Sequence, residues 1–68
     1  MSPQQSFDVM CANALLRIVK DKDTLWTEET PYLVMNLVKD IASTSPDLTL
    51  DDQPITLKFQ TLLNNRSQ

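Results

Sequence analysis

The chain contains no glycine among its 68 residues. Glycine is the residue that most readily takes the positive φ values that the tightest β-hairpin turns require. Turns in this chain must therefore be built from Pro, Asp, Asn, Ser and Thr, which favours helix caps over two-residue hairpins. The same absence excludes the glycine-rich loops that bind phosphates and dinucleotides. The sequence thus predicts helices joined by capped turns.

A chain of this length forms one domain, and it buries only about 60% of the surface that its unfolded form exposes. Small domains usually need further support from disulfides, a metal or a second subunit. Cys11 is the only cysteine and there is no histidine, so one chain can form neither a disulfide nor a zinc site of the usual type. Self-association is the remaining route, and we expect a homodimer without a cofactor.

Hydrophobic periodicity predicts an all-α fold, a small three-helix bundle with helices over about residues 3–20, 31–43 and 53–64. Ser2 is the expected cap of the first helix, with Pro3 at its first helical position. Thr30 is the expected cap of the second helix, with Thr27 as the alternative. The second helix must end before Pro46, because a proline disfavours helical geometry in the residue that precedes it.

The last third of the chain admits a second interpretation, two helices followed by a C-terminal β-hairpin. Apolar residues alternate with polar ones on both sides of the segment 51–54, at Leu48, Leu50, Ile55, Leu57 and Phe59. An isolated two-stranded hairpin is only marginally stable, which counts against this alternative. Ile55, Phe59, Leu62 and Leu63 also share one helical face, so we expect a helix here.

The first helix is apolar over an arc much wider than the usual stripe of about 100°. The centre of the arc is formed by Phe7, Cys11, Ala14, Leu15 and Ile18, and further apolar residues widen it on both sides. A polar strip of Asn13, Arg17 and Lys20 lies opposite. Two neighbouring helices cannot cover so wide an arc, and exposed apolar patches normally mark interfaces. The predicted interface residues are Val9, Ala12, Leu16 and Val19, joined by the aromatic residues Trp26 and Tyr32.

No constellation in the sequence is typical of an enzyme. A nucleophile needs a base beside it, and with no histidine the single thiol, Cys11, is more simply a small apolar residue on a helix face. The adjacent carboxylates Glu28–Glu29 and Asp51–Asp52 lie where helices are expected to begin, and negative charge is favourable there. We therefore expect no catalysis and find no indication of a small-molecule substrate.

The charge pattern does not favour nucleic acid as a partner. Six Lys and Arg residues stand against nine Asp and Glu residues, a net charge of −3, and the cations are scattered. The alternative function is a DNA-binding regulator of the helix-turn-helix type, which needs a recognition helix with exposed polar and cationic residues. The third helix offers Gln53, Thr56, Lys58 and Gln60, of which only one is a cation.

The segment from residue 1 to residue 9 has no basic residue and no long apolar run, so it does not resemble a secretory signal. No window approaches the roughly 20 apolar residues of a membrane span. With its initiator methionine, the sequence is expected to be a complete natural product. We expect a cytoplasmic, non-catalytic protein-interaction module, a regulator, adaptor or inhibitor that binds itself and another protein.

Overall fold

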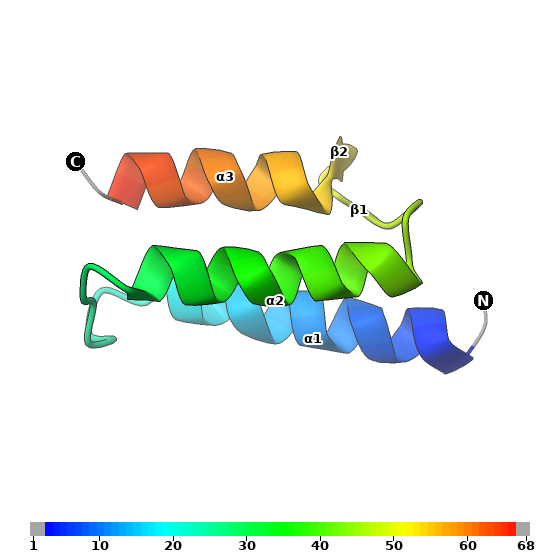
Figure 1. Ribbon diagram of the computed structural model, residues 1–68, viewed down its shortest axis with the longest axis horizontal. Coiled ribbons are helices and arrows are strands. Elements are labelled where there is room, and N and C mark those ends of the chain that lie inside the picture. The colour runs from blue at the N-terminus through cyan, green and yellow to red at the C-terminus, as the bar shows by residue number, and fades with distance from the viewer. Residues whose placement is uncertain (1–2, 67–68) are drawn as a thin grey trace.

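The computed structural model describes residues 3–66, which form three helices and one very small sheet (Figure 1). In chain order the elements are α1 (Pro3–Lys20), α2 (Thr30–Thr44), β1 (Thr49–Leu50), β2 (Gln53–Pro54) and α3 (Ile55–Arg66). Each helix runs antiparallel to the one before it, and all three pack against one another. The predicted arrangement of three packed helices is confirmed.

The helix α1 has the predicted bounds, but its inward face is rotated from the predicted one. The buried positions are Asp8, Ala12, Leu15 and Val19. Of the five residues expected at the centre of the apolar arc, only Leu15 is buried, Cys11 is half-buried, and the others are exposed. The physical reason is the burial of Asp8. Its carboxylate can lie in the interior because hydroxyl groups there donate hydrogen bonds to it. The predicted cap Ser2 lies outside the described residues.

The helix α2 begins one residue earlier than predicted and with a different cap. Glu29 occupies the cap position without a side-chain hydrogen bond, so the prediction of Thr30 as cap is wrong. Thr30 instead lies within the helix, and its hydroxyl accepts a hydrogen bond of 3.1 Å from the backbone N–H of Thr27. The helix ends at Thr44, one residue later than predicted but before Pro46 as expected, because Ser45, which precedes the proline, has left helical geometry.

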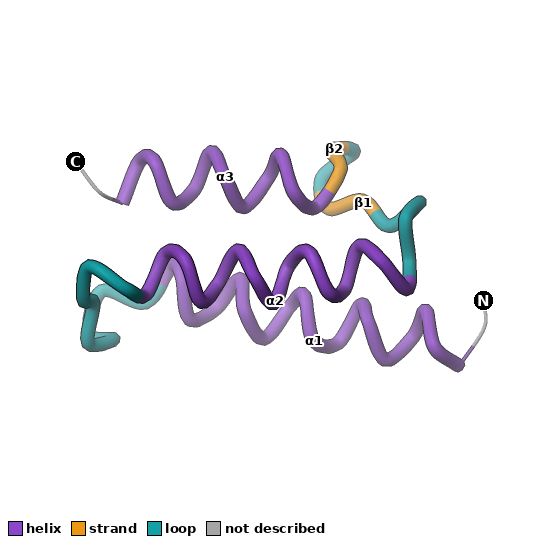
Figure 2. Tube along the Cα trace, viewed as in Figure 1, coloured by secondary structure: helices purple, strands orange, loops and turns teal. Residues whose placement is uncertain are grey.

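Both interpretations of the last third describe part of it. The strands β1 and β2 form a hairpin in which Leu50 pairs with Gln53. Asp51 and Asp52 connect them with φ values of 52° and 64°, so the preference for caps over tight hairpins is wrong at this turn. The predicted helix begins at Ile55 rather than at residue 53, since Gln53 and Pro54 belong to the hairpin. Figure 2 shows the hairpin leading directly into α3.

The core lies between the three helices and is closed by α3. Phe59 and Val38 are its largest fully buried side chains. The remaining buried apolar residues are Ala12, Leu15 and Val19 from α1, Val34 and Ile41 from α2, Leu48 before the hairpin, and Ile55 and Leu63 from α3. The predicted helical face of α3 is therefore confirmed, and Leu57 points outward.

Candidate functional site

Large apolar side chains remain exposed where α1 and α2 lie side by side. Phe7 is 60% exposed and Met10 is 70% exposed, and exposed apolar residues that gather in one patch commonly mark an interface. We call this surface the α1–α2 face and define it by Phe7, Met10, Ala14 and Ile18 of α1 with Leu33 and Leu37 of α2.

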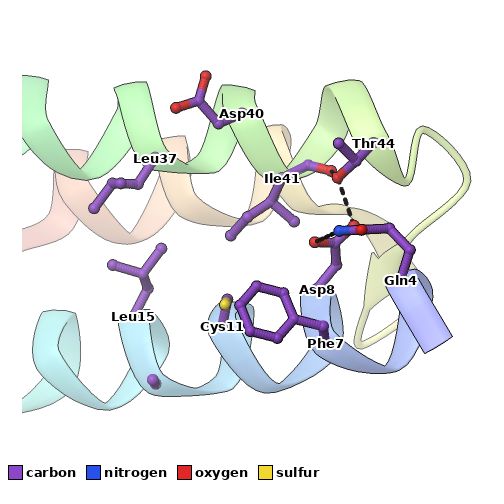
Figure 3. A pocket seen from close by; sticks show the side chains of 10 residues that line it. Gln4, Phe7, Asp8, Cys11, Leu15, Leu37, Asp40, Ile41 and Thr44 are labelled. Atoms are coloured by element: carbon purple, nitrogen blue, oxygen red, sulfur yellow. Dashed lines mark hydrogen bonds between the residues drawn. The ribbon is translucent and has the colours of Figure 1, made fainter.

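A groove of about 420 Å³ runs between the two helices within this face (Figure 3). Phe7, Cys11 and Leu15 line it from α1, and Leu37 and Ile41 line it from α2. Figure 3 looks into the groove, with α3 behind the two helices, so the groove opens on the side of the bundle that α3 does not cover. A second depression, on α1, is lined by Met10, Ala14, Arg17 and Ile18. Ala14 lines both, and the two hollows therefore adjoin.

One end of the groove is fixed by a buried carboxylate. Asp8 is only 3% exposed and accepts hydrogen bonds of 2.6 Å from the hydroxyl of Thr44 and 2.5 Å from the hydroxyl of Ser45. Gln4, one turn earlier in α1, donates a third of 3.1 Å. The hydrogen bond from Ser45, followed by that from Thr44, holds the pKa of the Asp8 carboxyl below its ordinary value. These bonds fasten the start of α1 to the end of α2.

The opposite end of the bundle is held by Arg66. Its guanidinium lies 4.3 Å from the centre of the Trp26 ring and donates a hydrogen bond of 3.2 Å to the carbonyl oxygen of Val19. That carbonyl belongs to the last turn of α1, where carbonyls lack partners within the helix. Arg66 thus joins the end of α3 to the end of α1 and covers Trp26. Polar contacts therefore hold the two ends of the bundle together, and mainly apolar side chains line the groove between α1 and α2.

The six residues predicted as an interface do not form one exposed surface. Ala12 and Val19 lie in the core. Val9, Leu16 and Trp26 are half-buried and pack against it. Only Tyr32 is freely exposed, at 74%. The interface remains a prediction, and the apolar surface that α1 offers lies on its other side.

The residues of the true inward face have helical spacing, although this spacing alone does not single them out. Asp8, Ala12, Leu15 and Val19 follow a 4-3-4 spacing, which places all four on one side of a helix. An aspartate at the first of these positions conceals the pattern, because a carboxylate near the start of a helix is also favourable at the surface. The apolar residues left over, Phe7, Met10, Ala14 and Ile18, then form the exposed stripe.

Outside the α1–α2 face, charged side chains either pair with one another or lie apart. Lys58, the cation of the possible recognition helix, forms an ion pair of 2.9 Å with Asp51. This pair lowers the pKa of the Asp51 carboxyl. Within residues 3–66, no three His, Cys, Asp or Glu side chains gather as a metal site would require. Among the helices in that range, none has the length and apolar character needed to cross a membrane.

The chain is thus a small three-helix protein in which the apolar groove between α1 and α2 is left uncovered. Comparison of the chain with protein families, with curated proteins and with solved structures finds no match.

Proposed function

We propose that the protein is a non-catalytic protein–protein interaction module, a cytoplasmic regulator, adaptor or inhibitor, that docks through the α1–α2 face. The observation that supports this function is the row of large apolar side chains that the three helices leave exposed beside an apolar groove. Keeping such side chains in water forgoes about 1.5–3 kcal/mol for each one that could be buried. A docked partner recovers that free energy.

The size of the exposed surface fits this role. If the area that an aromatic side chain buries, about 150–250 Å², is taken as the scale for one large side chain, the fractions exposed at Phe7, Met10, Ile18, Leu33 and Leu37 amount to roughly 400–700 Å². Apolar patches at the upper end of what soluble monomers display commonly serve binding. The groove between two helices is also suited to an amphipathic helix, whose apolar residues can enter it at helical spacing.

Two matched substitutions test the proposal. Leu37 in the α1–α2 face is 50% exposed, and Leu57 on α3 is 53% exposed. Leu37→Lys and Leu57→Lys therefore add the same charge at equally exposed helical leucines, and only the first falls within the face. Tagged wild-type protein and both variants are incubated with lysate of the source cells, and retained proteins, untagged copies of the chain included, are quantified by mass spectrometry.

We expect the proteins that wild type retains to be retained by Leu57→Lys and lost from Leu37→Lys, because an unpaired ammonium group in an apolar interface is costly. Circular dichroism of both variants checks that the helices are kept. If Leu37→Lys retains the same proteins as wild type, the α1–α2 face is not the docking surface.

A further inference from the structure

We infer that the occupant of the α1–α2 face is a second copy of this chain, related to the first by a two-fold axis. This inference rests on the proposed function, since it names the partner of the same face. Three observations on the face support it: its apolar area, the placement of its charges, and a small residue where the two hollows adjoin.

The apolar area is what a homodimer of ordinary size needs. Stable interfaces bury about 800 Å² on each partner, and homodimer interfaces are about 65% apolar. Each copy must then contribute roughly 500 Å² of apolar surface. The exposed side chains of the face supply about that amount by the estimate above. A domain of 68 residues has a small core, so a second subunit is also a common source of the stability that it lacks.

The charges at the edges of the face are self-complementary. Arg17 lines the depression on α1, and Asp40 lines the groove from α2, at its edge away from α1 (Figure 3). Neither forms an ion pair with another residue in the range 3–66. In a two-fold interface, if residue i of one copy meets residue j of the other, j also meets i. A two-fold axis that passes between Arg17 and Asp40 therefore creates two ion pairs at once.

Ala14 lies between these charges, where the groove and the depression on α1 adjoin. Its small side chain lets a second copy approach α1 closely, while Met10 and Ile18 on either side fill the space between the copies. A foreign helix could also enter the groove, but its charges would have to match Arg17 and Asp40 by coincidence. The second copy carries the matching charges by symmetry.

Sedimentation equilibrium of the purified full chain tests the inference through charge reversal. Wild type is expected to sediment as two chains of 7.8 kDa each. Arg17→Asp and Asp40→Lys each turn two attractive pairs into repulsive ones, and each should raise the dimer dissociation constant by about tenfold. The double variant Arg17→Asp/Asp40→Lys restores opposite charges and should return the constant to within about twofold of wild type.

Leu37→Lys should weaken the dimer by about a hundredfold or more, and Leu57→Lys should leave it unchanged. Far-UV circular dichroism of every variant checks that the helices are retained. A wild-type monomer at high micromolar concentration overturns the inference, and the proposed function still stands if Leu37→Lys loses a foreign protein from lysate. A dimer that is insensitive to Leu37→Lys overturns the second copy as the occupant of this face, and the proposed function fails as well if Leu37→Lys retains the same proteins from lysate as wild type. If Arg17→Asp and Asp40→Lys each weaken the dimer and the double variant does not restore its dissociation constant, the two-fold arrangement is wrong.

Discussion

The contact of Arg66 with Trp26 and Val19 predicts a measurable loss of stability when the arginine is removed. In Arg66→Ala the carbonyl of Val19 loses its donor, and the Trp26 ring loses the cation above it. The end of α3 is then no longer tied to the end of α1. Arg66→Lys keeps the positive charge but lacks the planar group that can stack and donate at the same time.

The size of the effect follows from three contributions. A hydrogen bond to a charged donor is worth about 1.5–3 kcal/mol, and a cation over an aromatic ring adds about 0.5–2 kcal/mol. Against these, the Nε of Arg66 is buried without a hydrogen-bond partner among the described residues, and its removal relieves a cost of about 1–3 kcal/mol. We expect Arg66→Ala to lower the free energy of unfolding by about 1–2 kcal/mol and Arg66→Lys by about half as much.

Urea unfolding followed by far-UV circular dichroism measures this difference, with all variants at one chain concentration, because association raises apparent stability. The fluorescence of Trp26, the only tryptophan, should also shift as water reaches its ring. Lys22→Ala, an exposed cation in the connection between α1 and α2, serves as the control. If Arg66→Ala is as stable as the control, or if Arg66→Lys is less stable than Arg66→Ala, the account of this contact is wrong.

Three further predictions concern the core, the buried carboxylate and the hairpin. Phe59→Ala removes a fully buried ring and should cost about 3–5 kcal/mol, so thermal melting should show a largely unfolded chain. Because Asp8 has a lowered pKa in the folded protein, its stabilisation is complete above the unfolded pKa of about 3.9 and is lost as the pH falls toward the folded value. Acid titration of stability should therefore be shallower in Asp8→Asn than in wild type, and equal slopes would contradict the hydrogen-bond geometry. Asp52→Gly should stabilise the protein by about 0.5–1 kcal/mol in urea unfolding, because Asp52 has positive φ and Asp51 is left to pair with Lys58.

The sequence predicts the helices well because their signals are local. Proline and the residue before it determine where α2 must stop, and the spacing of Ile55, Phe59 and Leu63 defines the inward face of α3. The hairpin is missed in part because Asp tolerates the left-handed conformation that glycine would otherwise supply. Such a turn becomes favourable only when the strands on both sides pair.

The inward face of α1 could not be predicted from the helix alone. Asp8 is buried because Thr44 and Ser45, 36 and 37 residues away in the sequence, donate to its carboxylate. The periodicity of one helix carries no information on such distant partners, and a carboxylate without them would not be buried. The error moves the predicted interface to Ala12 and Val19, and it hides the α1–α2 face on the other side of the same helix.

The most direct test of the α1–α2 face is an isotope-filtered nuclear Overhauser experiment on an equal mixture of labelled and unlabelled chains at millimolar concentration. Only contacts between different copies give signals in this measurement. Docking of a second copy on the α1–α2 face predicts contacts between copies from the methyl groups of Met10, Ile18 and Leu37, and none from Leu57. Contacts from Leu57 in place of Leu37, or no contacts between copies at all, would contradict docking of a second copy on this face.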